Sequence, residues 1–598
     1  MNPPTCTPIA THRNCQNPTI AYADASTPGI FTVGKLPATH DHIRPCLETR
    51  ETVGRLRNAM AATGCAALLA SLLVTVDVAA ASPPTAPAAQ VAIAPAGRGY
   101  ATPKLIDQRT NSPARQTATT ADHPVLGVDG KPTGATLPAG ISKAAKPSAA
   151  ATSARIPDGP NTGPSGQPRA PSPTTINSNF AGIDQAGGGG AQPSDINASV
   201  GTTQIMETVN RRVTVFSKTG VLQCTNTLAG WLGLGTTNVF DPRTIYDNLN
   251  NRFVIIATTS GTAGAAPRLF LAASTTSNAC GSYFVYTLTF TGALFPNGML
   301  LDYPYLGQDR TAILSSTNNF NPGYVNSTAW SVSKAQLYVG GAVSFPAFSV
   351  AFSTAPVTVT GIPIAATANT YYVAGVPGTG YNLYRMNNSA GPGTTLVLQA
   401  TIASAYAAPS RRVNQCGTTV TLDPLDGRIA WAPVQARNST FVWFTHGQNI
   451  GGFPGVRYGA INTATNTVTV ANAFHSGTSD DFNPSLGAFE TAPNSFNIWL
   501  NWAYTDTGAT TCTNTSTTFN GVLPGGGLPA LTGSDITLVT GSNTTTNTRF
   551  GDYSSVHVDP VPASGTCPAG STALLAQQYF VGGNWATRLA RVSIGPGC

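Results

Sequence analysis

Charged side chains are scarce in this sequence: Asp, Glu, Lys and Arg together make up 10% of its 598 residues. From Asp195 to the end of the chain there are 15 Arg and 13 Asp, but only two Lys and two Glu. The formal charge of +7 for the whole chain therefore falls to +2 over this part, where no basic patch interleaved with aromatics occurs. This pattern argues against a nucleic-acid partner. The small number of titratable groups also favours binding over acid–base catalysis.

The signatures of several enzyme classes are absent as well. There is no G-x-S-x-G elbow of an α/β-hydrolase, no H-E-x-x-H zinc motif and no C-x-x-C pair of a zinc or thioredoxin-like site. We therefore expect no cofactor, with Ca²⁺ as the one cation to consider.

Long apolar runs are also missing, apart from one near the N-terminus. Residues 55–82 combine two arginines, an apolar stretch at 66–76 and an Ala-Ala-Ala cleavage site, which predicts a signal peptide. The alternative, a membrane anchor, needs about 18 apolar residues, and Asp77 interrupts the run before that. Residues 1–54 precede this signal, so they are either outside the native protein, with translation starting near Met60, or an extended leader. We expect a secreted, extracellular or periplasmic protein with no membrane span after signal removal.

Cysteine usage agrees with export. Four of the ten cysteines lie in or before the signal, and an even number remains. The remaining six are Cys224, Cys280, Cys416, Cys512, Cys567 and Cys598. In an exported chain, this number and wide spacing predict up to three disulfides, whose pairing the sequence leaves open.

The remainder divides into a linker and one large domain. Residues 83–194 are rich in Pro, Ala, Thr, Ser and Gly and have almost no aromatics, which predicts a disordered linker. From 195 to 598, short runs of β-branched and aromatic residues alternate with Gly, Pro, Asn and Asp, and no stretch has a helical period. Strands at such short intervals over some 400 residues exceed what one sandwich needs. We predict an all-β fold, a β-propeller of six to eight blades with seven favoured.

Four segments strengthen this fold prediction. They are Phe240–Asp247 (FDPRTIYD) with Asn251–Phe253, Asp302–Gly307 (DYPYLG), Gly455–Tyr458 (GVRY), and Arg549–Ser555 (RFGDYSS) followed by Val558–Pro560 and Asn584–Arg588 (NWATR). In this order the segments resemble a family of bacterial secreted β-propellers that is loosely sialidase-like and largely uncharacterised. The Asp-Pro and Tyr-Asp pairs in these segments are typical of turns. The resemblance implies the architecture.

The resemblance does not extend to sialidase activity. The S-x-D-x-G-x-x-W turns that mark sialidases are absent. A sialidase also needs a glutamate beside its tyrosine, and only Glu207 and Glu490 are available in the domain.

Candidate catalytic residues are carboxylates. Glycoside hydrolysis needs two of them about 5–10 Å apart, and Asp552 and Glu490 are the candidates. The adjacent Asp480 and Asp481 form the one loop that suggests Ca²⁺ through hard oxygen ligands, although a solvated turn explains them too. His446, His475 and His557 are interpreted as surface or turn residues.

Candidate ligand-binding residues are two arginines and two aromatics. Arg457, Arg549 and Tyr553 lie in the segments quoted above, and Trp502 belongs to an FNIWLNW run. Tryptophan rings stack on sugars, but they also fill the space between propeller blades.

Three functions remain open. The first is a secreted propeller, expected to be monomeric, that binds an extracellular glycan or protein at the mouth of its channel. The second is a sialidase-like glycoside hydrolase or lyase that uses Asp, Glu and Arg at that mouth. The third is a structural surface protein.

Overall fold

A computed structural model of the chain describes residues 90–110, 174–262, 264–291, 294–321, 323–361, 369–437, 439–507, 513–522, 535–541, 544–595 and 598. The chain divides into two units, Met1–Pro83 and Pro84–Cys598, and every described residue belongs to the second. The predicted leader (1–54) and signal peptide (55–82) lie outside the described residues. Within the described part, no helix is long and apolar enough to cross a membrane.

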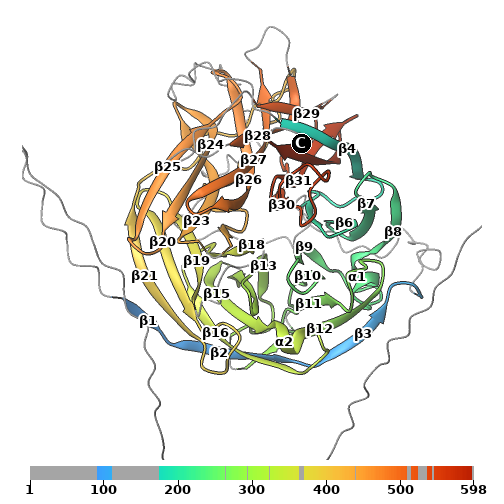
Figure 1. Cartoon of the computed structure of the whole chain (residues 1–598), viewed down its shortest axis with the longest axis vertical. Helices are drawn as coiled ribbons and strands as arrows, with labels where there is room; N and C mark the ends of the chain where they lie inside the picture. The colour runs from blue at the N-terminus through green and yellow to red at the C-terminus, as the bar shows by residue number, and fades with distance from the viewer. Residues whose placement is uncertain are drawn as a thin grey trace, which may run out of the picture. The chain divides into compact units, whose positions relative to one another are not determined.

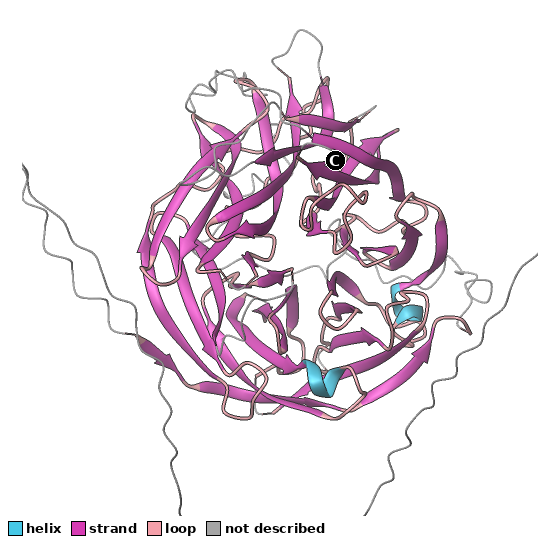
Figure 2. Cartoon of the chain, in the orientation of Figure 1, coloured by secondary structure: helices cyan, strands magenta, loops and turns pink. Residues whose placement is uncertain are grey.

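Strands form nearly all of the regular structure in the described ranges (Figure 2). The two helices described there are single turns, α1 (Leu228–Trp231) and α2 (Lys334–Leu337). The strands are built from β-branched and aromatic residues, which pack well on a pleated surface. In β10 (Arg252–Thr258), for example, every residue after Arg252 is buried. The predicted all-β class is confirmed.

Antiparallel strands follow one another along the chain in sets of four (Figure 1). The first set is β5 (Asn197–Val200), β6 (Gln204–Val209), β7 (Arg212–Ser217) and β8 (Leu222–Thr227). The second is β9 (Phe240–Asp247), β10, β11 (Leu269–Ser274) and β12 (Ser282–Phe290). The third is β13 (Leu300–Gln308), β14 (Ala312–Phe320), β15 (Tyr324–Ser333) and β16 (Val343–Val350). The fourth is β17 (Ala355–Pro356), β19 (Asn369–Val376), β20 (Gly380–Asn387) and β21 (Thr395–Ala403).

The later sets repeat this arrangement. The fifth is β22 (Val434–Ala436), β23 (Phe441–Ile450), β24 (Phe453–Asn462) and β25 (Thr467–Ala473). The sixth is β26 (Ser479–Ala492), β27 (Ser495–Asp506), β28 (Thr513–Val522) and β29 (Ile536–Thr540). The seventh is β30 (Ser555–Val558), β31 (Thr572–Val581), β32 (Asn584–Ile594) and β4 (Thr174–Asp184), so that a strand from before the first set completes the last.

The first strands of the sets contact one another in a closed circuit. β5 contacts β9, β9 contacts β13, β13 contacts β17, β22 contacts β26, β26 contacts β30, and β30 contacts β5. The remaining step, from β17 to β22, is made by the short strand β18 (Thr358–Thr360), which follows β17 after one residue and pairs in parallel with β22. The sets therefore lie around a common centre, which Figure 1 shows.

A left-handed residue lies within four residues of the start of five first strands, and Leu425 precedes β22 by nine residues. The residues and their φ angles are Asp195 (47°), Asp241 (52°), Tyr303 (56°), Ser353 (51°), Leu425 (66°) and Asn483 (49°). Asp and Asn adopt this conformation more readily than most residues. In three of these places a proline follows, so the Asp-Pro and Tyr-Pro pairs of the sequence belong to one repeated backbone turn.

The segment 83–194, for which the sequence predicts a disordered linker, contains paired strands. Besides β4, these are β1 (Val91–Ile93), β2 (Pro95–Ala101) and β3 (Pro103–Asp107). β1 pairs with β21, β2 with both β12 and β16, and β3 with β12. The composition does not predict these strands, because each is ordered by pairing with the edge of a strand that already has a core. Residues 111–173 of the predicted linker lie outside the described ranges.

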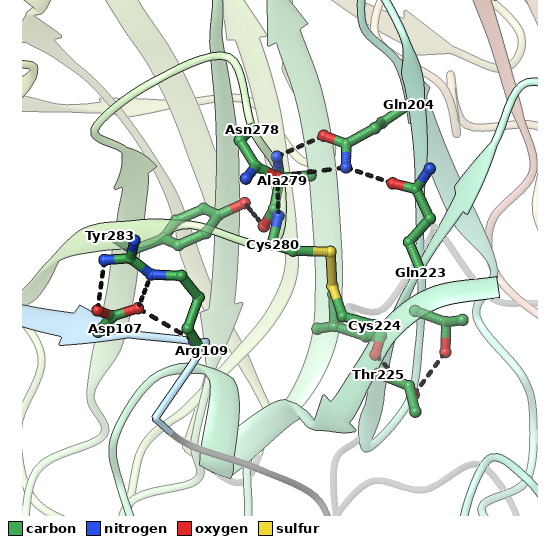
Figure 3. Close-up of a disulfide and its surroundings, with 12 residues drawn as sticks. Asp107, Arg109, Gln204, Gln223, Cys224, Thr225, Asn278, Ala279, Cys280 and Tyr283 are labelled. Carbon is green, nitrogen blue, oxygen red and sulfur yellow. Dashed lines mark hydrogen bonds and ion pairs between the residues drawn. A yellow bond between two sulfur atoms is a disulfide. The ribbon is translucent and has the colours of Figure 1, made fainter.

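Five of the cysteines that the structure describes are disulfide-bonded. Cys224 on β8 is bonded to Cys280, which precedes β12, so this disulfide joins the first set to the second (Figure 3). Cys567 is bonded to Cys598, and Cys416 is also disulfide-bonded. The predicted disulfides are thus confirmed for these five cysteines, while Cys512 lies outside the described residues. All seven tryptophans of the chain are buried.

Candidate functional site

Arg243 on β9 lies at the centre of the circuit. Its guanidinium carbon is 3.8 Å from the ring centroid of Tyr553, 4.9 Å from that of Tyr305 and 5.0 Å from that of Tyr303. Its Nη1 also donates a hydrogen bond of 3.0 Å to the carbonyl oxygen of Ala430. A second-set side chain thus touches the third set and the segments that lead into the fifth and seventh. We call Arg243, Tyr303, Tyr305 and Tyr553 the central cluster.

The central cluster holds hydrogen-bonding groups that the described protein does not satisfy. Arg243 is 1% exposed, and its Nε and Nη2 have no hydrogen-bond partner among the described residues. The same is true of the buried hydroxyl of Tyr553. Stacking on three rings offsets part of the cost of burying the cation. The unused N–H groups remain costly, since a buried donor without an acceptor loses about 1–3 kcal/mol.

The tyrosines of the central cluster keep their protons. Burial raises the pKa of Tyr305 to about 12 and places the pKa values of Tyr303 and Tyr553 well above the ordinary value. Two of the three hydroxyls act as donors within the protein, Tyr303 to the carbonyl oxygen of Asp552 at 2.7 Å and Tyr305 to that of Ile429 at 2.8 Å. The hydroxyl of Tyr553 is left to offer its proton to an added acceptor.

A buried lysine elsewhere in the ring shows the contrast. Lys334, at the start of α2, is 4% exposed and lines a small polar hollow. Its Nζ contacts Asp247 Oδ2 at 2.8 Å, Gln308 Oε1 at 3.0 Å and the carbonyl oxygen of Asp309 at 2.6 Å. The ammonium group has three donors, and all three are used. Lys334 is therefore a structural cation, whereas the Nε and Nη2 groups of Arg243 have no partner among the described residues.

The aspartates around the centre tie adjacent sets together. The backbone N–H of Asp552 donates to Asp195 Oδ1 at 2.8 Å, and that of Tyr303 donates to Asp241 Oδ2 at 3.1 Å. Asn210 joins two of these aspartates, since its Nδ2 donates to Asp195 Oδ2 at 2.7 Å and its Oδ1 accepts from the N–H of Asp241 at 2.9 Å. These carboxylates act as backbone acceptors.

Asp552, one of the two candidate catalytic carboxylates, forms a buried ion pair with Arg549, a candidate ligand-binding residue. The other carboxylate, Glu490, lies near the far end of β26, where its Oε1 accepts from the N–H of Asn494 at 3.1 Å. The start of β26 is beside Tyr553, because Asn483 Nδ2 donates to the carbonyl oxygen of Tyr553 at 3.1 Å. Seven residues of strand separate Asn483 from Glu490, a length of about 23 Å. This spacing is too long for the two carboxylates to act together on one glycosidic bond.

The remaining candidates for ligand binding, Arg457 and Trp502, have partners other than the four residues of the central cluster. Arg457 on β24 stacks on the ring of Tyr406 at 5.5 Å, and its Nη2 donates to Ser404 Oγ at 2.9 Å. Trp502 is 1% exposed, and its Nε1 donates to Asp481 Oδ1 at 2.9 Å. Trp502 therefore packs between the fifth and sixth sets, as the alternative interpretation of its FNIWLNW run expects.

The carboxylates considered for Ca²⁺ are engaged by protein donors. Asp480 forms an ion pair with Arg411, with contacts of 2.5 and 2.8 Å, and accepts from the N–H of Asn414 at 2.9 Å. Asp481 accepts from Ser479 Oγ at 2.6 Å as well as from Trp502. No group of three His, Cys, Asp or Glu side chains in the described ranges is placed to hold a metal ion.

The histidines differ from the surface interpretation. His446 and His557 are buried, and burial lowers their pKa values to about 3 and about 4. Of the three histidines in the described residues, His475 alone is partly exposed; its Nδ1 lies 2.5 Å from Asp535 Oδ2. In the interior, His446 Nε2 lies 2.9 Å from the hydroxyl oxygen of Tyr381, and the ring of His557 packs edge-on against Trp431 with centroids 5.1 Å apart.

Sequence reasoning missed Arg243, Tyr303 and Tyr305 as functional residues. They lie in the FDPRTIYD and DYPYLG segments, which were interpreted as turns. The available signal was their offset: Arg243 and Tyr305 each lie two residues after the left-handed residue of the turn.

Known proteins resemble this chain only distantly. No family model and no curated protein matches this chain. One similar solved structure is a subtype N10 neuraminidase-like protein of A/little yellow-shouldered bat/Guatemala/060/2010, with 7% identity and a TM-score of 0.30 over 55% of this chain and 96% of that one. Another is the apocarotenoid oxygenase of Synechocystis, with 10% identity and a TM-score of 0.33 over 58% and 75%. A third is an exo-beta-1,3-galactanase from Phanerochaete chrysosporium, with 11% identity and a TM-score of 0.28 over 71% and 100%. Similarities at these TM-scores assign neither a fold nor a function to this chain.

Proposed function

We propose that this chain is a secreted, seven-bladed β-propeller that binds an extracellular ligand at the centre of its ring. The antiparallel pairings within seven successive sets of strands support the blade number. The closed circuit of first strands and the completion of the seventh set by β4 support the propeller. Export is supported by the disulfides and by the predicted signal peptide at residues 55–82.

The ligand we propose is a glycan with a carboxylate group. The observation that carries this proposal is the pair of unused donors on buried Arg243, together with the unused hydroxyl of Tyr553. A carboxylate accepts hydrogen bonds through two oxygens, and guanidinium donors match that geometry. The tyrosine rings provide the flat apolar surface on which a sugar ring packs.

Binding fits this site better than catalysis does. Acid–base chemistry at the centre would need a carboxylate that is not already engaged, but Asp552 is paired with Arg549 and Asp241 accepts from the N–H of Tyr303. Because the central cluster is buried, a ligand has to open it before reaching Arg243. We therefore expect slow association and slow release, since conformational change lowers association rates.

The test is binding of the full chain to an array of acidic and neutral glycans. We expect retention of carboxylated glycans and no release of reducing ends. Arg243→Met should weaken binding by about tenfold or more, because hydrogen bonds to a charged group contribute about 1.5–3 kcal/mol. Tyr553→Phe, which removes only the hydroxyl, should weaken binding by a smaller factor.

Arg310→Met is the matched control, because Arg310 is an exposed arginine on the β13–β14 connection and its loss changes the net charge equally. Equal weakening by Arg243→Met and Arg310→Met would show general attraction of anions and would overturn the proposed site. Equal retention of neutral and acidic glycans would overturn the proposed ligand.

A further inference from the structure

A short N-terminal segment wraps the outside of the ring. We call residues 90–110, with strands β1, β2 and β3, the strap (blue in Figure 1). The strap runs along the outer strands of the fourth, third and second sets, because its partners are β21, β16 and β12. It thereby occupies sheet edges that would otherwise present unpaired N–H and C=O groups.

The strap is held mainly through its backbone. β2 pairs with β16 from Ala101↔Val343 to Pro95↔Phe348, and β3 pairs with β12 from Asp107↔Ser282 to Pro103↔Tyr286. Most of its side chains face solvent; Tyr100 is 46% exposed and Leu105 59%. Main-chain pairing of this kind is how an extended peptide adds to a sheet edge.

Two positions of the strap give this pairing its specificity. A Cβ atom at Gly99 would lie 2.3 Å from ring atoms of Phe345 and 3.1 Å from the ring of Phe290, so only glycine fits there. Near the other end, Ile106 is buried against the first set, and Gln108 Nε2 donates to the carbonyl oxygen of Trp231 at 2.8 Å. Beside this end, Asp107 pairs with Arg109 (Figure 3).

The strap is connected to the ring over a long stretch of sequence. Residues 111–173 separate it from β4, the next described strand. A tether of this length gives a modest effective concentration, since that concentration falls as the tether lengthens. A second copy of the chain carries an identical strap and identical edges.

We propose that the strap is an exchangeable strand, and that the outer edges of β12 and β16 bind the strap of a second copy of this chain. The edges accept an extended segment that has glycine opposite Phe345 and a small residue opposite Val343, and the strap of a second copy has both. Exchange leaves the pairing unchanged and replaces a contact within one copy by the same contact between two copies. The result is a strand-exchanged assembly that forms as the protein concentration rises.

The test uses a disulfide between two exposed register partners. Tyr100 and Ser344 are direct partners across β2 and β16, and both are exposed. Directly opposed residues of antiparallel strands have Cα atoms about 4.5–5.5 Å apart, a separation that a disulfide spans. Full chains that carry Tyr100→Cys alone and Ser344→Cys alone are mixed at rising concentration, oxidised mildly and separated without reductant. We expect a mixed covalent dimer that increases with concentration.

Two controls make each outcome decisive. A chain with both Tyr100→Cys and Ser344→Cys should close its disulfide within one copy at low concentration. Closure there without any mixed dimer in the mixture would overturn exchange, and no closure would overturn the docking itself. Val339→Cys, at a position that is 74% exposed and outside the receiving edge, replaces Ser344→Cys in a third mixture. An equal yield of mixed dimer there would show random collision and overturn the proposal.

Gly99→Val separates exchange from general loss of stability. Added to the Ser344→Cys copy, it prevents that copy's own strap from seating and should increase the mixed dimer. Added to the Tyr100→Cys copy, it removes the donor strand and should abolish the mixed dimer. The same change in yield from both placements would mean that Gly99→Val only unfolds the chain, and exchange would be refuted.

Discussion

Glu207 is a buried carboxylate at the point where the ring closes. It lies on β6 of the first set and is 0% exposed. Its Oε2 accepts from the N–H of Ile183 on β4 at 3.1 Å, and its Oε1 accepts from Thr587 Oγ1 on β32 at 2.5 Å. Both partners belong to the seventh set. Glu207 therefore joins the first set to the last.

Burial raises the pKa of Glu207 from 4.5 to about 7. In the folded state the carboxyl group holds its proton over a range where the unfolded chain releases it. The stability that this group contributes is thus fully present below about pH 4.5 and is lost as the pH rises through about 7. A shift of this size corresponds to about 3 kcal/mol of unfolding free energy.

Glu207→Gln should abolish this pH dependence. The amide carbonyl can accept from Ile183, the amide N–H₂ can donate to Thr587 Oγ1, and the side chain does not ionise. The difference in unfolding free energy, Glu207→Gln minus wild type, should increase by about 3 kcal/mol from about pH 4 to about pH 8. The increase arises because the wild type loses stability over this range and the variant does not. The measurement is urea unfolding at a series of pH values, with the difference between the two proteins plotted against pH.

The control for this experiment is Thr208→Val, a substitution at a buried position on the same strand that changes no ionisable group. Its difference from the wild type should stay flat over the same pH range. A flat difference for Glu207→Gln would refute the assignment of a protonated carboxyl group to the closure of the ring. A slope of opposite sign would show that the folded state stabilises the ionised form.

Three further predictions follow from other buried contacts. Asp481 also has its pKa raised to about 7 by burial, so Asp481→Asn should gain stability relative to the wild type as the pH rises from about 4 to about 7, in the same urea series. Gly307→Ala would place a Cβ 2.3 Å from the carbonyl oxygen of Val357; we expect a loss of about 1–3 kcal/mol and a lower Tm by calorimetry, whereas Gly235→Ala, with no atom within 4 Å, should cost only its backbone strain. Removing the disulfide between the first and second sets by Cys280→Ser should cost about 2–4 kcal/mol in urea unfolding, and an unchanged midpoint would show that the sets dock without it.

The candidate site was only partly within reach of sequence reasoning. Tyr553 and Arg549 were singled out from the RFGDYSS segment, and both lie at the centre, one in the central cluster and the other paired with Asp552. Arg243 was not, because its role depends on rings 60 and 310 residues further along the chain, at Tyr303 and Tyr553. No local pattern encodes such a separation. The separation between Asp552 and Glu490 likewise cannot be predicted from the sequence, because it depends on β26 starting beside Tyr553.

The sequence by itself determined the all-β class and the turns. Short runs of β-branched and aromatic residues such as RFVIIAT, with Asp-Pro and Tyr-Pro breaks between them, reflect backbone preferences that act within a few residues. Only the tertiary structure decided which strands became ordered and which charges were buried. The strap and β4 have the composition of a linker, yet they pair, because edges of strands with their own cores supply the missing hydrogen bonds. Arg243 became a buried cation for a similar reason: several sets converge on one axis and enclose a side chain that any one of them would leave in water.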